Sequence, residues 1–103
     1  GTNSAATNAM LRAGADQAAT GENSVSVAAG IADVIMGPVG IVIADSMLGE
    51  ITPRMALAVG RSRAKRILIP VNLCDNIVVG TYDVPMSKNV QNAVEALGPL
   101  MKK

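Results

Sequence analysis

Residues 32–49 read ADVIMGPVGIVIADSMLG, and this stretch decides the fold. An apolar run from Asp33 to Met36 leads into a turn that contains Gly37 and Gly40. A second apolar run follows, so the pattern predicts a buried strand, a tight turn and a helix over Gly40 to Leu48. This succession is the repeating unit of an α/β domain, in which ligands bind where strands end and helices begin.

Further helices are predicted on both sides of this unit. Ser4 is expected to cap a helix that runs to about Ala13 and ends at Gly14, where glycine can take a left-handed conformation. Thr52 followed by Pro53 marks the start of another helix, which should reach about Lys65.

Two segments complete the helical pattern. Residues 24–31 fit either a strand or a short helix, and the helix is favoured because the strand at 33–36 must follow almost at once. Apolar residues at helical spacing predict a terminal helix from Met86, which stops at Gly98-Pro99 or frays beyond them.

The remaining apolar runs are predicted strands. Ile67 to Val71 is apolar without alternation, which is typical of a central parallel strand covered on both faces. Ile77 to Val79 is a shorter candidate. Strands and helices that alternate through short loops predict a single α/β domain over residues 1–103, a small parallel sheet with helices on both faces, Rossmann-like.

The composition excludes several classes of partner. Nine basic and eight acidic residues leave a net charge of +1, and Tyr82 is the single aromatic residue available for stacking, so no nucleic-acid partner is expected. No apolar run reaches the roughly 18 residues that a membrane-spanning helix needs. No signal peptide is visible either, so we expect no membrane partner and a cytoplasmic location.

Cysteine and histidine usage limits the chemistry. Cys74 is the single cysteine and histidine is absent, so an intrachain disulfide and the usual zinc sites are excluded and no metal site is expected. Ser46 has no histidine or adjacent lysine to act as its base, and Cys74 next to Asp75 has no activating neighbour. No catalytic residue is predicted, and whether the chain is an enzyme stays open.

The candidate ligand-binding residues lie where predicted strands end or helices begin: Asn3, Ser4, Gly37, Gly40 and Asn72. Gly37 and Gly40 could bring backbone N–H groups to an anion. Asn72 directly follows an apolar strand and is expected to face the crevice. The structural alternatives are a tight turn for the glycines and helix capping for Asn3 and Ser4.

These features favour a protein that binds a small anionic or nucleotide-like ligand at the carboxyl ends of the strands. They do not identify a cofactor. One alternative is a nucleotide-cofactor enzyme that needs a further amino-terminal part. Another is an interaction module that assembles through the predicted helix 40–48. Because that helix is apolar nearly all round, we expect a homo-oligomer, most simply a dimer.

Several motifs together carry a family resemblance: GTNS at residues 1–4, MLRAGAD at 10–16, ATGEN at 19–23, GPVGI at 37–41, GEITP at 49–53 and IPVN at 69–72. On these motifs the chain resembles an uncharacterised bacterial family, the domain of unknown function DUF3842. The resemblance implies a Rossmann-like fold in which a strand, a glycine-rich turn, a helix and a second strand precede the segment that matches Gly1. It therefore implies that this chain is the carboxyl-terminal portion of such a domain, without the phosphate-binding loop.

Overall fold

The computed structural model describes residues 1–71, 76–80 and 84–101. Its regular elements are α1 (Ser4–Arg12), α2 (Glu22–Ile31), β1 (Val34–Pro38), the 3-10 helix η1 (Val39–Val42), α3 (Pro53–Arg61), β2 (Lys65–Ile69) and α4 (Met86–Met101). The two strands pair in parallel, with Val34 opposite Lys65 and Pro38 opposite Ile69. Since α3 lies in the connection between them, the predicted parallel α/β class is confirmed.

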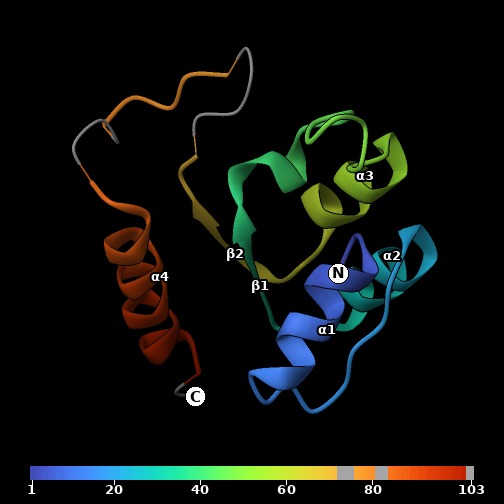
Figure 1. Cartoon of the computed structure of the whole chain (residues 1–103), viewed down its shortest axis with the longest axis horizontal. Helices are drawn as coiled ribbons and strands as arrows, with labels where there is room; N and C mark the ends of the chain where they lie inside the picture. The colour runs from blue at the N-terminus through green and yellow to red at the C-terminus, as the bar shows by residue number, and fades with distance from the viewer. Residues whose placement is uncertain (72–75, 81–83, 102–103) are drawn as a thin grey trace.

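The strand pair lies between two groups of helices. Figure 1 shows α4 on one side of β1 and β2, and α1, α2 and α3 on the other. No residue of either strand is fully buried, although apolar runs without alternation had predicted cover on both faces. The helices therefore cover the described part of the sheet only in part.

The best buried side chains lie under α3 rather than in the sheet. Ile51 is 1% exposed, and Met55 and Ala56 are also buried. Met55 and Val59 are four residues apart on α3 and lie on one buried face of the helix, and Ile51 is buried just before the helix begins. The half-buried side chains packed against this cluster come from α2, η1 and the loop before α3: Val25, Ile41 and Met47.

The helix starts follow capping chemistry, with one correction. Thr52 caps α3 as predicted, because its hydroxyl accepts the Met55 N–H at 3.2 Å. The cap of α1 is Asn3 and not Ser4. The Asn3 side-chain oxygen accepts the Ala6 N–H at 2.8 Å, which makes Ser4 the first helical residue.

Other helix predictions hold with changed bounds. The ambiguous residues 24–31 are helical and belong to α2. The helix that starts at Pro53 ends at Arg61 instead of near Lys65. Its end is set by Ser62, whose hydroxyl donates to the Ala29 carbonyl at 2.6 Å and accepts the Ala64 N–H at 3.0 Å.

The predicted helix over Gly40 to Leu48 is wrong. Within this range only residues 40–42, which belong to η1, are helical, and a bend and turns follow as far as Glu50. Asp45, Met47 and Leu48 have φ values of 66°, 56° and 58°, which a right-handed helix cannot accommodate. The Asp45 N–H instead donates to the carbonyl of Ile51 at 2.7 Å and closes the segment into a loop.

Two further differences lie towards the carboxyl end. Residues 77–79 do not form the predicted strand, and Ile77 and Val79 are largely exposed. Helix α4 continues through Pro99 to Met101, because a proline in the last turn removes only one backbone hydrogen bond. Across the described parts of the chain, every helix is too short or too polar to cross a bilayer.

Candidate functional site

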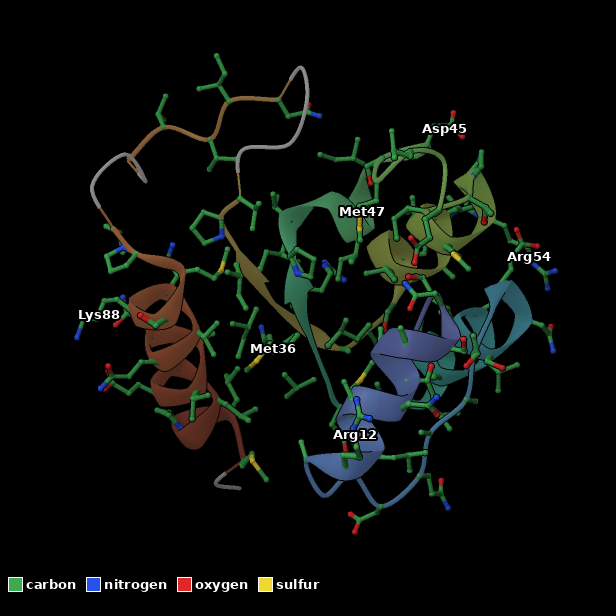
Figure 2. The ribbon with its side chains drawn as sticks, in the orientation of Figure 1. Arg12, Met36, Asp45, Met47, Arg54 and Lys88 are labelled. Atoms are coloured by element: carbon green, nitrogen blue, oxygen red, sulfur yellow. The ribbon has the colours of Figure 1, made fainter. Side chains whose placement is uncertain are left out.

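A cavity of about 530 Å³ lies between β1 and the helices α1, α2 and α3. Its lining is mostly aliphatic and includes Ala6, Val25, Met47, Ile51 and Met55, and none of the described lining residues has a charged side chain. In Figure 2 the Met47 side chain points inward beside α3, whereas Asp45, Arg54 and Lys88 lie at the outer surface. The side chains that line the cavity are therefore mostly apolar and carry no charge.

A polar cluster adjoins this cavity and is formed by Thr2, Asn3 and Glu50. The Thr2 hydroxyl donates to Glu50 Oε1, and the Asn3 side-chain amide donates to the same oxygen at 2.5 Å. Thr2 also lines the cavity, as do Met47 and Ile51 on either side of Glu50 in the chain. The carboxylate thus lies beside the apolar space, at its edge.

The two hydrogen bonds determine the charge of the cluster. They come from Thr2, which has the larger effect, and Asn3, and they lower the pKa of Glu50 against a smaller opposing effect of burial. Glu50 is therefore ionised at neutral pH. A carboxylate in this state accepts hydrogen bonds and disfavours a second negative charge next to it.

A glycine turn and backbone hydrogen bonds fix the main chain on both sides of Glu50. Gly49 before it has a φ of 83°, which glycine adopts without a steric penalty. The Glu50 N–H donates to the Met47 carbonyl and the Ile51 N–H donates to the Ser46 carbonyl, both at 3.2 Å. Since Ile51 is anchored in the core, the carboxylate projects from a fixed position in the loop.

The structure places the five predicted ligand-binding residues in different surroundings. Asn3 belongs to the polar cluster, and Gly37 lines the cavity. Ser4 is exposed at the start of α1 and does not line the cavity. Gly40 is buried, and its carbonyl accepts the Ser46 hydroxyl at 2.6 Å. Asn72 lies outside the described residues.

Gly37 and Gly40, the two glycines of the turn, have different structural roles. A side-chain carbon at Gly37 would lie 3.1 Å from Ile41 Cδ1, so glycine leaves room for Ile41 to pack over the end of β1. The turn continues into the four-residue η1 rather than a long helix. The helix-dipole argument that predicted an anion at Gly40 therefore loses its basis.

Sequence reasoning missed Thr2 and Glu50. The usable signal was the order Gly49-Glu50-Ile51-Thr52, an acidic residue fixed between a glycine turn and a helix cap. Contact between this carboxylate and Asn3 joins residues that are 47 positions apart in the chain. No local pattern predicts such a contact.

Among the described residues, no group of three or more histidine, cysteine or acidic side chains could hold a metal ion.

Two comparisons with known proteins find no match, and a third identifies the family. No curated protein and no solved structure matches the chain. The match to a protein family covers residues 1–102, almost the entire sequence. The chain belongs to the DUF3842 family, a domain of unknown function.

Proposed function

We propose that this chain is a binding protein for a small organic molecule, which occupies the cavity between β1 and α1, α2 and α3. The observation that carries the proposal is the cavity itself. Its volume of about 530 Å³ falls within the 300–1,000 Å³ typical of ligand pockets. An apolar lining with a few polar groups at one edge is also the usual composition of such sites.

Binding is favoured over catalysis by the arrangement of the reactive side chains. The Ser46 hydroxyl donates to the Gly40 carbonyl at 2.6 Å, which is a structural role in the loop. Glu50 is hydrogen-bonded to Thr2 on the cavity wall, and its lowered pKa makes it a poor proton acceptor. A bacterial origin, a cytoplasmic location and a homodimeric state stay predictions.

Methyl NMR on methionine tests the proposal, because the methionines report on different parts of the molecule. Met10, Met36, Met47 and Met55 line the cavity, while Met86 and Met101 on α4 do not. A protein labelled with ¹³C at the methionine methyl groups would be titrated with a library of neutral, fragment-sized organic compounds. We expect some compounds to shift signals of the four cavity methionines and leave the two α4 signals unchanged.

A matched pair of variants in α1 provides the control. Ala6 is half-buried and lines the cavity, whereas Ala9 is exposed and does not. Ala6→Leu places a larger side chain in the cavity and should weaken binding of any compound found by NMR, and Ala9→Leu should leave it unchanged. If no compound shifts the cavity methionines, or if both variants bind equally well, the proposal is wrong.

A further inference from the structure

The chemistry of the polar cluster limits what the cavity can accept. Among the described residues, both hydrogen bonds to the Glu50 carboxylate end on Oε1, so Oε2 retains its capacity to accept protons. The Thr2 hydroxyl uses its proton on Glu50, and its oxygen can still accept a hydrogen bond. The cluster therefore presents two neighbouring acceptors, one of them on the cavity wall.

No cationic side chain of the described residues pairs with Glu50. The partners of the carboxylate are the uncharged side chains of Thr2 and Asn3. A neutral hydroxyl can donate to the remaining carboxylate oxygen, whereas direct contact with the carboxylate disfavours a phosphate.

We infer that the ligand of this cavity is a neutral molecule with adjacent hydroxyl groups and an uncharged ring system, as in a nucleoside. One hydroxyl donates to the Glu50 carboxylate and its neighbour donates to Thr2 Oγ1. The faces of the ring system pack against the aliphatic side chains that line the cavity. This inference rests on the proposed function and names the ligand class of the same site.

Three matched compounds test the inference on the wild-type protein. Adenosine carries the adjacent hydroxyls, 2′,3′-dideoxyadenosine lacks them, and AMP adds a phosphate. In the methionine titration we expect adenosine to bind at least about tenfold more tightly than the dideoxy compound, since two hydrogen bonds are lost, one of them to a charged group. AMP should bind no more tightly than adenosine.

Two variants then assign the selectivity to the carboxylate. Glu50→Gln keeps the size of the side chain and removes its charge, and it should reduce the preference for adenosine over 2′,3′-dideoxyadenosine by about fivefold to tenfold. Glu95→Gln, on the exposed surface of α4, removes the same charge away from the cavity and should leave the preference unchanged. An unchanged signal of the buried Met55 in the ligand-free variants would show that both are folded.

Each alternative outcome has a definite meaning. Equal binding of adenosine and the dideoxy compound, or tighter binding of AMP, would overturn the inference even if Glu50→Gln failed to fold. The inference would also be wrong if other neutral compounds shifted the cavity methionines and no nucleoside did, although the proposed function would then stand. If no compound of any kind shifted those signals, the proposed function itself would fail.

Discussion

Replacing Ile51 by alanine is expected to lower the free energy of unfolding by about 3 kcal/mol. The side chain is 1% exposed and lies in the buried cluster with Met55 and Ala56. The change removes three carbon atoms, which accounts for about 2 kcal/mol at roughly 0.8 kcal/mol each. Because Ile51 also forms part of the cavity wall, the surroundings cannot close over the new space, and the enlarged void adds about 1 kcal/mol.

Urea denaturation followed by circular dichroism measures this loss. For a chain of this size a slope of about 1–3 kcal/mol per molar urea converts the change into a midpoint shift of about 1–3 M. Leu57→Ala is the matched control, because Leu57 lies on α3 with half of its surface exposed. If Ile51→Ala shifted the midpoint no further than Leu57→Ala, the core would not lie where we place it.

Four further predictions follow from burial, strain, charge and exposure. Ile69→Ala should lower the free energy of unfolding, measured by urea denaturation, by about 1–2 kcal/mol. This loss is smaller than for a fully buried isoleucine because Ile69 is only half-buried, and a loss as large as that of Ile51→Ala would contradict the prediction. Leu48→Asn should raise the free energy of unfolding by about 0.5 kcal/mol, because Leu48 has a φ of 58° that asparagine tolerates better; a lowered urea midpoint would show that this φ carries no strain. The lowered pKa of Glu50 stabilises the folded protein above the ordinary glutamate pKa, and this contribution is lost as pH falls through the lowered value. Urea midpoints measured from neutral pH to about pH 3 should therefore fall less steeply in Glu50→Gln than in the wild type, and parallel profiles would refute the assignment. Leu48 is 99% exposed, so we expect it to lie in the interface if the chain forms a dimer. Leu48→Asp should then sediment more as a monomer than the wild type does, and a wild type that is already monomeric would contradict the predicted dimer.

Local signals were sufficient where a local interaction determines the structure. Thr52 and Pro53 predicted the start of α3 because a hydroxyl cap and a fixed proline φ act within one helical turn. Apolar runs predicted β1 and β2 and their parallel pairing. Both ends of each strand differ from the predicted bounds by one or two residues. Such shifts arise because the ends of strands depend on the pairing partner.

The site was only partly predictable for the same reason. Asn3 and Gly37 were identified from their places at the ends of elements, and both take part in the cluster or the cavity. Gly40 was placed at the start of a long helix because the apolar run after it suited one, and its ligand role stays a prediction. The segment instead packs as a loop in which Ile41 and Met47 contact the core.

The sequence by itself determined the parallel α/β class and the elements that match α1, α2, β1, α3, β2 and α4, because these depend on periodicity, caps and composition over short stretches. Only the tertiary structure decided that residues 43–50 form a loop with positive φ at Asp45, Met47, Leu48 and Gly49, and that Glu50 meets Thr2 and Asn3. The physical reason is the distance along the chain. Burial of Ile51 and hydrogen bonds across 47 or 48 positions outweigh the local helical preference of the loop, and no short window of sequence contains both partners.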